Sequence, residues 1–210
     1  MNPRYAVLLD GGFVTKILSM RKREFPVAGD IVAEVQRIAS IPELNGHDLF
    51  RVYYYDAPPS NEQLTNPVDK SRINMTQCAT YQQRLNFIRD LELTPNFAVR
   101  KGVTKTRGWK IKKSVLKDMG SGPPSQSATL KAQDLQPDIQ QKGVDIRIGL
   151  DIALLALRHH VQVIVVVTGD SDFVPAFKFA RREGVRLFFD HLGFSVKGNE
   201  ELKVHADFVL

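Results

Sequence analysis

The chain has 210 residues, 43% of them hydrophobic, so it can bury the core of one domain. Its formal net charge of +6 suits the binding of a polyanion such as nucleic acid. The single cysteine, Cys78, excludes an internal disulfide and a cysteine-rich zinc site, and no apolar run is long enough for a membrane helix. Because the N-terminus also lacks the pattern of a signal peptide, we expect a cytoplasmic protein.

The first half of the chain alternates strand and helix patterns. Residues 5–9 form a continuous apolar run, typical of a strand buried on both faces, and Gly11 and Gly12 then allow a tight turn into a helix from about Phe13. Apolar spacing predicts a helix over 30–39, and aromatic and β-branched residues predict a strand over 49–55. We expect a long helix over 73–91, then a strand over 93–100 that Pro95 restricts to a sheet edge.

The second half continues the alternation after a long connecting segment. It predicts a helix over 145–158, a buried strand over 161–167, a helix over 173–183 and a strand over 185–189. A last helix and a short strand are expected within 199–208. Strands that alternate with helices are typical of an α/β fold with a mainly parallel sheet and helices on both faces.

A basic tract occupies 101–117, and we expect a loop at about 102–141, which is long for a compact domain. Residues 120–127 are rich in Gly, Pro and Ser and predict a loop. The cations can contact RNA phosphates, and Trp109 can stack on an unpaired base. A solvated, flexible loop whose tryptophan covers an apolar patch fits the tract equally well. The candidate substrate-binding residues here are Lys105, Arg107, Trp109, Lys110, Lys112 and Lys113.

Carboxylates follow both of the strongest strand patterns. Asp10 ends the first strand, and Asp170 and Asp172 follow the strand at 161–167. In open α/β sheets the ligand crevice lies beyond the carboxyl ends of the strands, so we expect these side chains to lie together. Clustered carboxylates repel one another unless a cation lies among them. The pattern therefore predicts a site for Mg²⁺ or Mn²⁺.

Two further carboxylates, Asp145 and Asp151, lie upstream of the second of these strands. Six residues along a regular helix turn a side chain away from the first one's direction, so both cannot point at one ion. Either the helix starts late, or one of the two carboxylates does not bind the ion directly and instead orients a ligand or has a structural role. Asp145 also fits a simple helix cap.

Four blocks of the sequence resemble one known family. They are residues 8–13 (Leu-Leu-Asp-Gly-Gly-Phe), 142–145 (Lys-Gly-Val-Asp), 150–156 (Leu-Asp-Ile-Ala-Leu-Leu-Ala) and 167–175 (Val-Thr-Gly-Asp-Ser-Asp-Phe-Val-Pro). In order and spacing they resemble the NYN domain, in its LabA-like (DUF88) branch, which is related to PIN-domain nucleases. The resemblance runs from about residue 4 to 189, apart from residues 105–141. It implies one PIN-like, Rossmann-like domain over 1–210, with the segment at about 102–141 as an insertion.

The resemblance also implies a ribonuclease that depends on Mg²⁺ or Mn²⁺, and it gives roles to single residues. Asp10 takes the place of the first-strand acid, Asp151 that of the helix-start acid, and Asp170 and Asp172 those of the paired acids after the fourth strand. These four would be catalytic, and with Asp145 of the Lys-Gly-Val-Asp motif they would hold the metal. Ser171 would bind a phosphate or a metal-bound water. Many members carry Asn where this chain has Gly12-Phe13, so substrate positioning at this turn should differ.

Other functions fit the sequence less completely. A haloacid-dehalogenase-type phosphatase needs a second Asp two residues after the first, and Gly12 occupies that position. One alternative is a catalytically silent RNA-binding module. Another is a regulatory module that binds a protein partner through an exposed apolar surface near Phe188, Phe189 and Phe194. The five carboxylates argue against a silent module, because a protein that only binds a polyanion gains no affinity from an acidic pocket. A homo-oligomer is left open.

Overall fold

The computed structural model describes residues 2–120, 129–194 and 199–210, and its centre is a parallel sheet of six strands. The strand order is β10-β9-β8-β1-β2-β5, and every neighbouring pair is parallel. The strands are β1 (Arg4–Asp10), β2 (Asp48–Asp56), β5 (Phe97–Lys101), β8 (Val163–Val167), β9 (Arg186–Asp190) and β10 (Phe208–Val209). The sheet confirms the predicted α/β fold class. Phe188 and Phe189 of β9 are fully buried in it, so the exposed apolar surface expected there is wrong.

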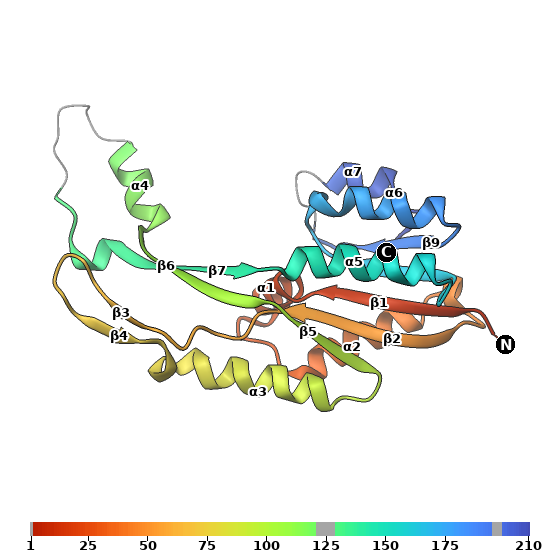
Figure 1. The fold of residues 1–210 in the computed structure, drawn as a ribbon, viewed down its shortest axis with the longest axis horizontal. Helices are drawn as coiled ribbons and strands as arrows, with labels where there is room; N and C mark the ends of the chain where they lie inside the picture. The colour runs from red at the N-terminus through yellow and green to blue at the C-terminus, as the bar shows by residue number, and fades with distance from the viewer. Residues whose placement is uncertain (1, 121–128, 195–198) are drawn as a thin grey trace.

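Helices cover both faces of this sheet (Figure 1). One face carries α1 (Gly11–Lys22), α2 (Ala28–Ala39) and α3 (Ala79–Leu93), with η1 (Pro42–Leu44) after α2. The other carries α5 (Val144–Leu157), α6 (Val174–Arg182) and α7 (Asn199–Val204). Within the described ranges, no helix combines the length and apolar character needed to cross a membrane.

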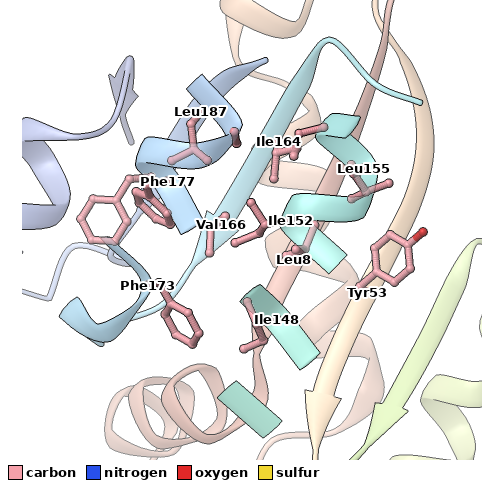
Figure 2. Close-up of a cluster of buried hydrophobic side chains, with 14 of the residues drawn as sticks. Leu8, Tyr53, Ile148, Ile152, Leu155, Ile164, Val166, Phe173, Phe177 and Leu187 are labelled. Carbon is pink, nitrogen blue, oxygen red and sulfur yellow. The ribbon is translucent and has the colours of Figure 1, made fainter. Parts of the chain in front are cut away.

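The apolar runs form strands because their side chains are buried alternately on the two faces. Leu8 of β1 and Val166 of β8 pack against α5 and α6, as Figure 2 shows, whereas Val7 and Leu9 face the other helices. All of these side chains are fully buried. A polar substitution in either strand would therefore place an unsatisfied group in the core.

The chain order places a topological switch between β1 and β8. From β1 the chain builds outwards through β2 to β5, and it then returns to β8 and builds the other half through β9 and β10. Ligands of open α/β sheets bind at such a switch, beyond the carboxyl ends of the strands. Asp10, at the end of β1, and the residues after Val167 lie at this point.

An arm projects beyond the carboxyl ends of the strands (Figure 1). It consists of the antiparallel pair β6 (Val103–Ile111) and β7 (Leu135–Lys142), with α4 (Lys113–Gly120) and η3 (Ala132–Asp134), beside the small pair β3 (Gln63–Thr65) and β4 (Arg72–Asn74). A loop was expected for the basic tract, and this expectation is wrong. The Gly/Pro/Ser-rich stretch at 121–127 lies outside the described residues.

Two predicted boundaries also need correction. The helix expected at 73–91 begins only at Ala79, after β4 and the short η2 (Met75–Gln77). The cause is Asn74, whose side chain accepts hydrogen bonds from the amide and the hydroxyl of Thr76 and so favours a turn over a helix. The strand expected at 93–100 begins at Phe97, after Pro95, and it does form an edge of the sheet.

Candidate active site

Asp10 links the end of β1 to the start of α1. Its Oδ1 accepts a hydrogen bond from the Phe13 amide at 3.2 Å, so the side chain caps the helix. Its Oδ2 accepts from the Thr168 hydroxyl at 2.9 Å, and that hydroxyl accepts from the Asp170 amide at 3.1 Å. Thr168, which is fully buried, therefore ties the two strand ends together.

Thr168 was not among the site residues predicted from the sequence. A signal was present, because a hydroxyl directly after a buried strand and before Gly169-Asp170 is placed to bond across the switch point. Its energetic role follows from the buried position, where an unpaired hydroxyl would be costly.

The turn after Asp10 is packed so tightly that it requires a residue without a side chain. A Cβ placed on Gly11 would lie 2.5 Å from the carbonyl oxygen of Tyr55 and 2.7 Å from the Tyr54 ring. A Cβ on Gly169 would lie 2.6 Å from the Phe13 ring. Phe13 therefore packs directly over the loop that carries Asp170, which gives the Gly12-Phe13 sequence a structural role at this site.

Asp145 from α5 and Asp170 from the loop after β8 lie near Asp10, and Asp172 lies near Asp145. Asp170 accepts from the Asp172 amide at 3.0 Å and caps η4 (Ser171–Phe173), while Asp145 lies in the first turn of α5. Burial, with smaller effects of the Asp145 and Asp170 charges, raises the pKa of Asp10 from 3.8 to about 6. Burial, followed by the charges of Asp170 and Asp172, also raises the pKa of Asp145.

The structure does not bring Asp151 into this cluster. Its carboxylate accepts from the Tyr55 hydroxyl at 2.8 Å and forms an ion pair with Arg100 Nε at 3.2 Å. It lies six residues beyond Asp145, or about 9 Å along the axis of α5. The helix thus holds Asp145 and Asp151 apart, and only Asp145 lies near the other carboxylates.

The four remaining carboxylates fit a hard divalent cation in chemistry and in charge. All their donor atoms are oxygens, and each Asp10 oxygen keeps a lone pair beside its hydrogen bond. In the described parts of the chain, no three His, Cys, Asp or Glu side chains are arranged to hold one ion directly. This arrangement suits Mg²⁺, which retains several waters and uses one or two carboxylates together with substrate phosphates.

The arm separates the candidate RNA-binding residues onto two faces. Lys105, Arg107 and Lys110 are exposed on one face, where Lys110 pairs with Asp138 at 2.7 Å. A bulge between Thr106 and Trp109, at Gly108 with φ +86°, turns the half-buried Trp109 to the other face. There it lines a groove together with the half-buried Lys112, whereas Lys113 is exposed at the start of α4. Ser171, beside Asp170, is also exposed.

Comparison with known proteins places the chain in a family. The family model described as the NYN domain matches residues 30–207, a range that includes Asp145, Asp170 and Asp172 but begins after Asp10. The structure of a protein of unknown function from Vibrio parahaemolyticus is similar, with a TM-score of 0.53 and 15% sequence identity. That match covers 100% of this chain and 92% of the other, and at this identity it supports the fold alone. No curated protein matches the chain.

Proposed function

Because this chain belongs to the NYN-domain family, a PIN-like nuclease family, we propose that it is a metal-dependent ribonuclease of the LabA-like (DUF88) branch. The observation that carries the proposal is the approach of four carboxylates at the switch point, with the pKa of Asp10 raised to about 6. Such an arrangement costs free energy in the absence of a cation, and it is typical of a functional site.

Asp10, Asp145, Asp170 and Asp172 would hold Mg²⁺ or Mn²⁺, in part through water. When bound, the ion lowers the pKa of a coordinated water and offsets charge on the phosphate. Thr168 and the Phe13 amide hold the Asp10 carboxylate in place. The exposed Ser171 hydroxyl would donate to a phosphate oxygen. Asp151 lies outside the proposed ligand set, because Tyr55 and Arg100 already engage it.

The arm would supply the contacts with RNA. Lys105 and Arg107 are exposed and carry charge beyond the carboxyl ends of the strands, where a bound phosphate chain would pass. Trp109 offers a ring to an unpaired base on the opposite face, where Lys112 lies, and Lys113 adds charge at the start of α4. Lys110, on the face of Lys105 and Arg107, would contact a phosphate in place of Asp138. We take the chain as one domain in which residues 102–141 form this inserted arm.

One observation favours a second candidate, an RNA-binding module of the same fold without turnover. No three carboxylates in the described ranges are already placed to hold one ion directly. The two candidates differ in whether bound RNA is cleaved when Mn²⁺ is added.

The experiment is cleavage of an end-labelled single-stranded RNA with Mn²⁺ or Mg²⁺, beside an EDTA control. The wild type and Asp151→Asn should cleave, whereas Asp170→Asn should not, although all three should fold. Asp151→Asn is the matched control because it removes the same charge from a carboxylate outside the cluster. RNA that stays intact with the wild type in both metals would reject the ribonuclease, and equal cleavage by Asp170→Asn would reject the assigned site.

A further inference from the structure

A cavity of about 470 Å³ opens beside the carboxylate cluster, where the arm meets the start of α3. Its walls come from the loop after β2, from η2 and α3, and from both strands of the arm. Gly12 forms part of its rim: a Cβ there would lie 3.5 Å from Asp10 Oδ1 and 4.0 Å from Gln141 Oε1. The cavity and Asp10 are therefore immediate neighbours.

A buried carboxylate holds the polar wall of this cavity in place. Asp56 is only 1% exposed, and it accepts hydrogen bonds from Gln141 Nε2 at 2.6 Å and from the Ala57 amide at 2.7 Å. Arg84 Nη2 lies at 3.3 Å from the same carboxylate. An ionised carboxylate only accepts hydrogen bonds, so it fixes the amide nitrogen of Gln141 towards itself and leaves the amide oxygen, Oε1, for the cavity.

The remaining wall is largely apolar. Met75 and Tyr81 line the cavity and are both half-buried. The Arg84 side chain also lines the cavity, and its guanidinium is held by Asp56. A ligand with a flat apolar face and a polar edge that donates to Gln141 would fit this wall.

We propose that this cavity binds the unpaired base of the nucleotide that adjoins the phosphate at the carboxylate cluster. The base would lie against Tyr81 and Met75 and donate an N–H to Gln141 Oε1. A paired base has its edge occupied and its faces stacked, so the substrate must be single-stranded at this nucleotide. The position of the phosphate rests on the proposed ribonuclease function, whereas binding of the base does not depend on cleavage.

The test is a binding measurement in EDTA with a fluorescein-labelled single-stranded octaribonucleotide and the same sequence as a duplex. Thr80 is exposed at the cavity rim, so Thr80→Trp places a large ring in the cavity with little effect on the core. Gln82→Trp, also exposed on α3 but outside the cavity, is the matched control. Tyr81→Ala removes the stacking wall instead of filling the space.

We expect the wild type and Gln82→Trp to bind the single strand more tightly than the duplex. Thr80→Trp and Tyr81→Ala should each weaken binding of the single strand by about tenfold, as the loss of one stacked base does. A single abasic nucleotide moved along the strand should reproduce this loss at one position only. Wild-type affinity in both cavity variants, or equal wild-type affinity for single strand and duplex, would overturn the proposal.

Cleavage is scored separately in Mn²⁺, so the two proposals can fail independently. Binding that depends on the cavity, with no cleavage by the wild type, would retain the base site and reject the ribonuclease. Cleavage by the wild type, with unchanged binding in both cavity variants, would retain the ribonuclease and reject the base site.

Discussion

Replacing Asp10 by Asn should stabilise the metal-free protein at neutral pH. The pKa of Asp10 is 3.8 ordinarily and about 6 in the folded protein, so the folded state holds this proton more tightly than the unfolded state. The stability that comes from the bound proton is complete below pH 3.8 and is lost as the pH rises through about 6. At 1.36 kcal/mol for each pH unit between the two values, ionised Asp10 costs about 3 kcal/mol.

The net gain in stability should be smaller, because Asn has one acceptor oxygen. It cannot accept hydrogen bonds from both the Phe13 amide and the Thr168 hydroxyl as the two carboxylate oxygens do. Loss of one hydrogen bond costs about 1 kcal/mol, which leaves a gain of about 2 kcal/mol. Asn remains a good helix cap for the Phe13 amide, so that bond should persist. For a chain of this length the gain corresponds to a rise in Tm of roughly 6 °C.

The assay is urea and thermal unfolding in EDTA from roughly pH 4.5 to about pH 7.5. The advantage of Asp10→Asn should grow with pH and be largest near neutrality. Added Mn²⁺ should stabilise the wild type more than the variant, because the ion offsets the charge that the variant lacks. Asp151→Asn is the control, since it breaks an ion pair and should bring no gain. An Asp10→Asn protein less stable than the wild type at neutral pH would refute the reasoning.

Three further variants test the packing, the arm and the link between the strands. Gly11→Ala should lower the free energy of unfolding in urea by about 3 kcal/mol, because the new Cβ meets the Tyr55 backbone. Gly12→Ala is the control and should have almost no effect, since its Cβ meets only ordinary contacts. Equal effects of the two variants would contradict the tight turn. Removing two exposed arm cations should lower the salt dependence of RNA binding by roughly 1.4 in log–log slope, and an unchanged slope would exclude the arm. The arm variant is Lys105→Ala with Arg107→Ala, and its control, with equal charge loss beside the amino end of β9, is Lys178→Ala with Arg182→Ala. Thr168→Val should lower cleavage and raise the pKa of Asp10 further, because it removes the hydrogen bond to that carboxylate. Thr168→Ser keeps the hydroxyl, so it should behave as the wild type in cleavage and in an NMR titration of Asp10. Equal behaviour of the two variants would show that the hydroxyl does not link the strand ends.

The central fold could be predicted because its signals are local. The apolar runs that became β1 and β8 are continuous, and a continuous run of that length fits a strand covered on both faces. Their neighbouring positions in the sheet, and the approach of Asp10 to Asp170, then follow from the parallel topology.

The choice between Asp145 and Asp151 could not be made locally. Helix geometry shows only that the two carboxylates diverge. What separates them is Tyr55 from β2 and Arg100 from β5, which engage Asp151 from distant parts of the chain. The cavity beside Gly12 is hidden from sequence analysis for the same reason, since Asp56, Arg84 and Gln141 meet only in the folded structure.

The arm carried a signal that its composition obscured. Thr104 and Thr106 alternate with Lys105 and Arg107, which is the period of a strand, but the polar character of both faces favoured a loop. Hydrophobic patterning is weak in this hairpin because it projects from the sheet (Figure 1) and no residue of its two strands is buried. The long segment thus has regular structure without the usual apolar evidence for it.

Acidic and basic groups in this protein imply that RNA binding and metal binding are separable. Four carboxylates at the switch point repel a phosphate until a cation offsets their charge. The exposed cations of the arm and the neutral base cavity carry no such penalty. RNA should therefore bind the arm and the cavity in EDTA, with a steep dependence on salt. Only the step that brings a phosphate up to Asp10 should require Mg²⁺ or Mn²⁺, so metal should change cleavage far more than affinity.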